Sequence, residues 1–313
     1  MTANPDIQPR LDHVTCASPA GMHRMAYREW GDPDNDRVVL CVHGLTRSGR
    51  DFDPLARQMA GTHRVVCPDI VGRGRSDWLI DPAYYAVPQY VSDLLTLVAR
   101  LRPARLDWVG TSMGGLIALG MVAGLVMSRL GAPQRGGHGL PDDDRLALGR
   151  VVLNDIGPHI QTDGLERIAD YVGQPVQFDR FEDAVAYVRS TSAEFGPHDD
   201  AGWRALTENV FVEVDGKWVK HYDLRIAEPM GRETPETMAA SEQLLWTAFD
   251  ALSAPVLIVR GAHSDLLNED TLEQMLARNP QAQAMTVPGV GHAPTLRSAD
   301  QLEPVCAFLR GTP

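Results

Sequence analysis

One serine in this chain lies where it could act as a nucleophile. The stretch Gly110-Thr111-Ser112-Met113-Gly114 follows the apolar run Leu106–Val109 and precedes an apolar helical pattern that starts near Leu116. Glycines on both sides permit a tight turn between a strand and a helix, and such a turn projects the serine hydroxyl away from the backbone. The N-terminus of the helix adds free N–H groups that stabilise negative charge on a reacting carbonyl oxygen. The spacing therefore predicts acyl transfer through Ser112.

A nucleophilic serine needs a base, and the base needs an acid that orients it. His292 lies in a glycine-containing loop directly after the last strand-like run, and we expect it to be the general base. Asp265 lies in the loop that follows the run Pro255–Arg260, and we expect it to be the acid. Asp155, directly after an earlier strand-like run, is the competing candidate for the acid.

The oxyanion of the tetrahedral intermediate needs backbone donors. The segment His43-Gly44-Leu45-Thr46 follows another apolar run, and a backbone N–H after His-Gly commonly completes an oxyanion hole in this setting. We expect the Leu45 N–H to be one donor, with Thr46 as second choice, and the Met113 N–H to be the other. His43 is expected to shape the loop rather than to take part in the reaction.

Cofactor and metal chemistry are not indicated by the sequence. No His, Cys or carboxylate cluster has metal-ligand spacing, so we expect no metal. Gly289-x-Gly291 is followed by Pro294 and opens no helix, so it is not a dinucleotide-binding loop, and we expect no cofactor. The four cysteines are interpreted as small core residues in a reducing compartment.

The elements that must position these residues are read from hydrophobic patterning. Six short apolar runs alternate with amphipathic helical patterns, which is typical of a parallel sheet covered on both faces. Two further runs, His13–Ser18 and Arg24–Trp30, flank a Pro-Ala-Gly turn and indicate an antiparallel hairpin. The fold class is therefore α/β, with a doubly wound, mostly parallel sheet and an antiparallel N-terminal hairpin. The six runs are Arg37–Val42, Arg64–Cys67, Leu106–Val109, Val151–Asn154, Pro255–Arg260 and Ala284–Val287.

Two segments interrupt the alternation of strands and helices. Residues 128–149 are rich in Gly, Pro and Asp and are interpreted as a flexible surface insertion. Residues 157–251 contain amphipathic helices and one hairpin signal, Asp215-Gly216 between two alternating runs, but no run suited to a buried parallel strand. We expect this second segment to be a mainly helical cap, inserted between the first part of the core, 1–156, and the second part, 252–313.

Charge and composition restrict the partners of this chain. Its 313 residues carry a formal net charge of −12, which disfavours nucleic acid and anionic membranes and leaves a small molecule as the expected substrate. The charge-free stretch Trp108–Met127 is long enough to span a bilayer, but its glycines and strand-like start favour a buried strand, turn and helix. Met1–Arg10 has no apolar stretch of a signal peptide, so a cytoplasmic location is expected. Assembly into a homo-oligomer stays open.

Several stretches together resemble the α/β-hydrolase superfamily, in the branch that includes small esterases, lactonases and meta-cleavage carbon–carbon hydrolases. The resemblance implies the α/β-hydrolase fold, a Ser-Asp-His triad and a carboxylesterase-like activity. The insertion at 128–149 is longer than is usual there, and no cap signature points to one substrate class. The stretches are Val39–Gly44, Pro68–Asp77, Gly110–Gly114, Arg260–Asp265 and Gly291-His292.

The expected function is hydrolysis of a small or medium carboxylic ester, or of a lactone, through an acyl-enzyme on Ser112. Cleavage of a carbon–carbon bond in a meta-cleavage product and acyl transfer to another acceptor are the alternatives. A non-catalytic ligand receptor on the same fold is a further alternative, which a test for turnover of a generic ester would exclude. A haloalkane dehalogenase would carry an aspartate at the position of Ser112.

Overall fold

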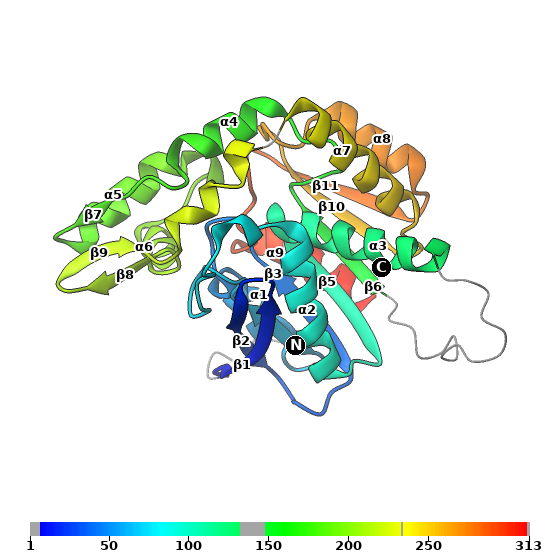
Figure 1. The fold of residues 1–313 in the computed structure, drawn as a ribbon, viewed down its shortest axis with the longest axis horizontal. Helices are drawn as coiled ribbons and strands as arrows, with labels where there is room; N and C mark the ends of the chain where they lie inside the picture. Colours follow the sequence, from blue (N-terminus) through cyan, green and yellow to red (C-terminus); the bar gives the residue numbers. More distant parts are fainter. Residues whose placement is uncertain (1–6, 132–147, 233, 312–313) are drawn as a thin grey trace.

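The computed structural model describes residues 7–131, 148–232 and 234–311. Its centre is an eight-stranded sheet in the order β1-β2-β4-β3-β5-β6-β10-β11 (Figure 1). β1 pairs antiparallel with β2, and β2 pairs antiparallel with β4, while the remaining pairs are parallel. The predicted mixed sheet is therefore confirmed. The strands are β1 Arg10–Ser18, β2 Gly21–Trp30, β3 Arg37–Val42, β4 Arg64–Pro68, β5 Arg105–Thr111, β6 Leu148–Asn154, β10 Val256–Gly261 and β11 Ala282–Val287.

Helices cover both faces of the sheet, as a doubly wound fold requires. Alternate residues of β3 enter two different hydrophobic cores: Val38, Leu40 and Val42 pack on one side, and Val39 and Cys41 on the other. The first core includes apolar residues of α2, α3 and α8, and the second includes those of α1 and α9. This two-sided burial explains why the parallel strands read as continuous apolar runs. The helices are α1 Asp53–Met59, α2 Val87–Leu101, α3 Met113–Gly131, α8 Glu269–Arg278 and α9 Ala299–Arg310.

One strand departs from the expected burial. The run Ala284–Val287 is predicted as a buried strand, but β11 is the last strand of the sheet, and its residues Gln283, Ala284 and Thr286 are exposed. An edge strand has a neighbouring strand on one side only, so its side chains are covered less completely than those of a central strand. The apolar pattern therefore located the strand, while its burial depended on its place in the sheet.

The segment 157–251 contains helices and a small second sheet, which arch across the top of Figure 1, and its last helix, Pro235–Asp250, packs against α3. The predicted hairpin is confirmed: β8 and β9 pair antiparallel, and Asp215 and Gly216 both have positive φ, at 51° and 74°. Apolar side chains from α5, α6 and β8 form a separate small core within this segment. The elements are α4 Thr162–Tyr171, β7 Gln177–Phe178, α5 Phe181–Thr191, η4 Ala193–Phe195, α6 Asp200–Glu208, β8 Phe211–Val214, β9 Lys217–Lys220 and α7 Pro235–Asp250.

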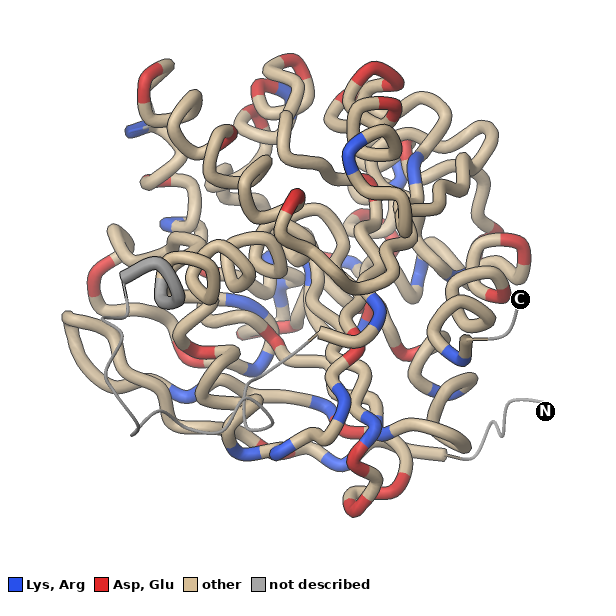
Figure 2. Tube along the Cα trace, turned by 90° about the vertical axis from the view of Figure 1, so that its right-hand side faces the viewer, with Lys and Arg blue, Asp and Glu red and all other residues tan. Residues whose placement is uncertain are grey.

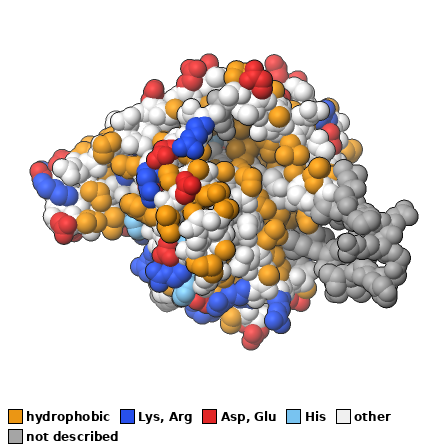
Figure 3. Space-filling view, in the orientation of Figure 1, with side chains coloured by type: hydrophobic (Ala, Val, Ile, Leu, Met, Phe, Trp, Pro, Cys, Tyr) orange, Lys and Arg blue, Asp and Glu red, His pale blue; other side chains and the backbone are white. Residues whose placement is uncertain are grey.

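Two further expectations concern the surface. The predicted insertion at 128–149 lies mostly outside the described residues, between the end of α3 and the start of β6. In the described part of the chain, no helix is both long and apolar enough to cross a membrane. In Figure 3, acidic side chains gather along the upper edge of the face shown and several Lys and Arg side chains lie along its lower edge, while Figure 2 gives the positions of the charged residues along the chain from the side. The net negative charge is thus unevenly distributed.

Candidate active site

Ser112 occupies the sharp turn between β5 and α3. Its φ is +50°, in the left-handed region that residues with a Cβ rarely adopt. A Cβ on Gly110 would lie 2.4 Å from the backbone carbon of Gly114, and a Cβ on Gly114 would lie 2.0 Å from the carbonyl oxygen of Val42. Both positions therefore require glycine, because strand and helix approach each other too closely for any side chain. The turn that the sequence predicts is present.

A chain of hydrogen bonds runs from Ser112 through His292 to a carboxylate. His292 Nε2 lies 2.8 Å from Ser112 Oγ, and His292 Nδ1 lies 2.8 Å from Asp155 Oδ2. A carboxylate can only accept, so Nδ1 carries the proton and the Nε2 lone pair faces the serine hydroxyl. The Asp155 side chain is fully buried and that of His292 nearly so. This is the geometry that general-base activation of a serine requires.

Asp265 does not hold the position that the sequence analysis expects. Its carboxylate forms a bidentate ion pair with Arg167 of α4, at 2.5 Å to Nε and 2.9 Å to Nη2. Burial acts to raise the pKa of Asp265, but the hydrogen bond and charge of Arg167 outweigh it, and the pKa is lowered. The expectation that Asp265 bonds to His292 is therefore wrong, because both Asp265 carboxylate oxygens accept from an arginine of the inserted segment.

Asp155 is held by the backbone of the neighbouring strand. Its N–H donates to the carbonyl oxygen of Val259 at 2.7 Å, and its Oδ1 accepts from the N–H of Gly261 at 2.8 Å. Its φ of +59° is unusual for a residue with a Cβ, although aspartate tolerates it better than most. Strands β6 and β10 are parallel neighbours, so the loops that follow them both begin at the carboxyl edge of the sheet. Position in the sequence therefore did not distinguish Asp155 from Asp265.

The expected oxyanion donors are free to bind a ligand. The backbone N–H groups of Leu45, Thr46 and Met113 donate to no described residue. His43 is fully buried, with Nδ1 at 2.7 Å from the Gly44 carbonyl oxygen and Nε2 accepting from the Ile70 N–H at 2.9 Å. Burial lowers the pKa of His43 to about 4, so its ring is neutral and has no free nitrogen. His43 thus shapes the loop, as predicted.

Arg73 is a residue near the site that the sequence analysis did not single out. It is completely buried, and its Nε donates to the Leu45 carbonyl oxygen at 2.8 Å. Its Nη1 donates to the Val71 carbonyl oxygen and to the Tyr90 hydroxyl, and its Nη2 contacts Met113 Sδ at 3.7 Å. One guanidinium thereby fixes both loops that carry the expected oxyanion donors. Its only sequence signal is its place in the Gly-Arg-Gly of the stretch 68–77.

A cavity of about 50 Å³ lies between the loop after β3 and the segment 157–251. It begins at Thr46 and Arg47, next to the expected oxyanion donors, and is closed by residues of α4, α5, β8 and β9. A larger hollow of about 220 Å³ lies along β1 and β2 and contains no residue of the Ser112–His292–Asp155 chain. The smaller cavity does not include these three residues either, but its lining includes Thr46, the second-choice oxyanion donor, and the larger hollow includes none of the expected donors. The smaller cavity is therefore the nearer of the two to the candidate active site.

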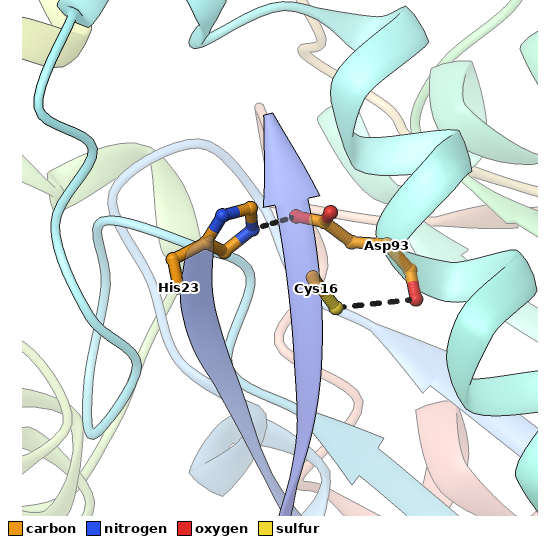
Figure 4. Close-up of side chains that lie close together, drawn as sticks. All are labelled: Cys16, His23 and Asp93. Carbon is orange, nitrogen blue, oxygen red and sulfur yellow. Dashed lines mark hydrogen bonds and ion pairs between the residues drawn. The ribbon is translucent and has the colours of Figure 1, made fainter. Parts of the chain in front are cut away.

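Three potential metal ligands meet between the N-terminal hairpin and α2 (Figure 4). Cys16 Sγ donates to the Asp93 carbonyl oxygen at 3.9 Å, His23 Nε2 lies 2.8 Å from Asp93 Oδ2, and Gln89 donates to Asp93 Oδ1 at 2.7 Å. Burial raises the pKa of Cys16 to about 12, which keeps the thiol protonated. A structural zinc site has four ligands and deprotonated thiols. We therefore describe this cluster as a polar network, although His23 Nδ1 has no partner among the described residues.

Comparisons with known proteins show the family of this chain. The model of the alpha/beta hydrolase family matches residues 39–305. The chain is 47% identical over 307 residues, covering 97% of it and 98% of the relative, to the 3-hydroxybutyrate-oligomer hydrolase of Cupriavidus necator. It is 28% identical to the pimeloyl-[acyl-carrier protein] methyl ester esterase of Xanthomonas campestris, over 85% of this chain and 91% of that protein. The crystal structure of an alpha/beta hydrolase from Novosphingobium aromaticivorans superposes with a TM-score of 0.80, at 32% identity, covering 97% and 98% of the two chains.

Proposed function

This chain belongs to the α/β-hydrolase family and is a hydrolase of ester bonds, and we propose that it cleaves short oligoesters of 3-hydroxybutyrate. The nucleophile is Ser112, the general base is His292, and the acid that orients the base is Asp155. The observation that carries the proposal is the continuous hydrogen-bond chain through these three side chains, at 2.8 Å for each link. The choice of substrate is supported by the relative that is 47% identical over almost the whole chain.

The proposed reaction transfers an acyl group to water. His292 Nε2 accepts the Ser112 hydroxyl proton while Oγ attacks the ester carbonyl carbon, and the backbone N–H groups of Leu45 and Met113 hold the oxyanion. Collapse of the intermediate breaks the bond to the alcohol oxygen, which leaves with the proton from Nε2. Water then attacks the acyl-enzyme by the same route, releases the acid and regenerates Ser112. Asp155 holds the imidazole in the required tautomer and stabilises the imidazolium.

We also propose that residues 157–251 act as a cap over this site. The contacts that attach the segment to core loops include the Arg167–Asp265 ion pair, the Gly291 N–H to the Glu194 carbonyl oxygen at 2.7 Å, and Ser48 Oγ to the Asn209 carbonyl oxygen at 3.1 Å. Glu194 belongs to η4, so the cap touches the loop that carries His292. The cap would therefore shape the acyl or alcohol side of the pocket.

The nucleophile is tested by covalent labelling and by turnover. A fluorophosphonate should modify Ser112, and Ser112→Ala should abolish both the labelling and the hydrolysis of the 3-hydroxybutyrate dimer. An adduct mapped to a different residue would contradict the assignment of the nucleophile. Turnover of p-nitrophenyl esters without turnover of the dimer would leave the triad intact and overturn the proposed substrate.

The cap is tested by its effect on substrate preference. Val188 lines the cavity, and Val188→Ala should change the ratio of rates on p-nitrophenyl acetate and p-nitrophenyl hexanoate. Val214→Ala removes the same atoms from an exposed position of the same segment and should leave the ratio unchanged. Equal ratios in both variants, with folding intact, would mean that the cap does not line the site.

A further inference from the structure

Lys220 is a cation that lines the cavity beside Thr46 and Arg47. Its Nζ donates to two backbone carbonyl oxygens, those of Tyr171 at 2.8 Å and Gln174 at 2.9 Å, near the C-terminal end of α4. Among the described residues no carboxylate forms an ion pair with it. An ammonium group has three donors, and two are used here. The third donor and the positive charge are available to a ligand.

The second cation that lines the cavity already has a carboxylate partner. Arg47, which lines the same cavity, forms a bidentate ion pair with Asp51 at 2.7 Å for each bond. Lys217, three residues before Lys220 on β9, is exposed and pairs with Asp179 at the surface. Lys217 and Lys220 are the two lysines of this chain. Lys220 is thus the lysine that contributes unpaired charge to the cavity, and Lys217 is its natural control.

Hydrogen-bonding groups surround this charge. Tyr171, Tyr187 and Tyr222 line the cavity with Lys220. Lys220 Nζ lies 5.9 Å from the centre of the Tyr187 ring and 5.5 Å from that of Tyr222. None of the three phenolic hydroxyls has a hydrogen-bond partner in the described part of the chain. The cavity therefore combines a positive charge with unused hydroxyl donors, which is a composition suited to an anion.

The cavity is close to the nucleophile. A Cβ on Gly44 would lie 3.7 Å both from Arg47 Cγ, which borders the cavity, and from Ser112 Cβ. On the side of the cap, Tyr222 forms a β-bridge with Arg73, the residue that holds the Leu45 carbonyl oxygen. The Lys220 end of β9 is thereby tied to the loop of the expected oxyanion hole. A ligand in the cavity would extend from the reacting carbonyl group.

We propose that Lys220, with the hydroxyls of Tyr171, Tyr187 and Tyr222, binds the free carboxylate of the oligoester substrate. This inference rests on the proposed function and specifies its substrate as an anionic ester. A 3-hydroxybutyrate oligomer carries one carboxylate at its end, and in the dimer this group is separated from the scissile ester oxygen by a two-carbon link. The cavity of about 50 Å³ has room for a small group such as a carboxylate.

The protonation state of Lys220 is compatible with binding a carboxylate. Burial lowers the pKa of Lys220 to about 8, so the side chain is still mostly protonated at pH 7. A bound carboxylate would offset the desolvation of the ammonium group by direct charge pairing. Charge-assisted hydrogen bonds of this kind are stronger than neutral ones, so they can distinguish an acid from its neutral ester.

The first experiment compares the 3-hydroxybutyrate dimer with its methyl ester, which lacks the charge. Lys220→Met should lower the ratio of kcat/KM for the acid to that for the methyl ester by about 10- to 100-fold. Lys220→Arg should retain most of the ratio, and Lys217→Met should retain all of it. An unchanged ratio in Lys220→Met overturns the proposal, and so does an equal loss on both substrates when Ser112 is still labelled by a fluorophosphonate.

The second experiment does not depend on oligoester turnover. Free 3-hydroxybutyrate should inhibit hydrolysis of p-nitrophenyl acetate competitively, and methyl 3-hydroxybutyrate should inhibit it much less. Lys220→Met should raise the inhibition constant of the acid by about 10-fold or more, with Lys217→Met as the control. If the wild type does not hydrolyse the dimer but shows this inhibition, the proposed substrate fails and the carboxylate site stands. Equal inhibition by acid and methyl ester overturns the carboxylate site.

Discussion

Two loops at the carboxyl edge of the sheet each carry an aspartate, and the two aspartates differ in burial and in hydrogen-bond partner. Asp155, after β6, is fully buried and meets the histidine ring. Asp265, after β10, is partly exposed and meets an arginine of the inserted segment. The two carboxylates differ in partner rather than in chemistry. An aspartate at the sheet edge is thus available either to the reaction or to the attachment of the segment above it.

Close packing of α4 against the loop after β10 accompanies this difference between the two aspartates. A Cβ on Gly164 of α4 would lie 2.6 Å from the Asp265 carbonyl oxygen, so the helix lies directly against the loop after β10. Arg167, one turn further along α4, then reaches the Asp265 carboxylate. Asp155 is fully buried, and its two carboxylate oxygens are taken by the His292 ring and the Gly261 N–H. The approach of α4 therefore engages Asp265 and leaves Asp155 to His292.

The largest expected difference between the two loops is in turnover. Asp155→Asn should lower kcat by about 10⁴-fold, because the amide cannot hold the imidazole in the required tautomer. Asp265→Asn should lower kcat by less than about 10-fold, since it acts only through the Arg167 contact. Both are measured with p-nitrophenyl butyrate, with circular dichroism as the check on folding. Similar losses of kcat in the two variants would mean that both aspartates orient His292. A larger loss in Asp265→Asn would mean that Asp265 has this role instead of Asp155.

A smaller difference is expected in stability. Arg167→Met and Asp265→Asn, measured alone and combined in urea unfolding, should give a coupling energy of about 1 kcal/mol, because this bidentate pair is only partly exposed. The exposed pair Arg189–Asp200 offers a matched control, for which about 0.5 kcal/mol or less is expected. If the two cycles give the same value, the Arg167–Asp265 pair is no more than a surface contact, and the proposed attachment of α4 is wrong.

The smallest effect concerns pH. The pKa of Asp265 is lowered below 3.8 in the folded chain, so its stabilisation is fully present above the unfolded pKa and is lost as pH falls through the folded value. The gap in free energy of unfolding between the wild type and Asp265→Asn should therefore be constant from pH 7 to about pH 5 and should shrink below about pH 4. Urea titrations at pH 7, 5, 4 and 3 measure it. A gap that widens on acidification would contradict the assigned ion pair.

Much of the architecture follows from local patterns. The predicted run Arg37–Val42 has the same bounds as β3, and the Asp215-Gly216 signal located the hairpin of β8 and β9 to the residue. Glycines at 110 and 114 are required by contacts within one turn, which is why the motif around Ser112 could be read without a structure. These features depend on residues that are close in sequence, where sterics and turn chemistry act directly.

Patterns local in the sequence thus predict the sheet, the turn that carries the serine, and the order in which serine and histidine appear. The folded chain was needed to establish which aspartate faces His292, which arginine holds the Leu45 loop, and that Lys220 lines the cavity with no ion-paired carboxylate among the described residues. Each of these depends on side chains that come from distant parts of the chain. Several charged groups meet at one edge of the sheet. Which of them pair depends on the folded arrangement and cannot be read from their spacing in the sequence.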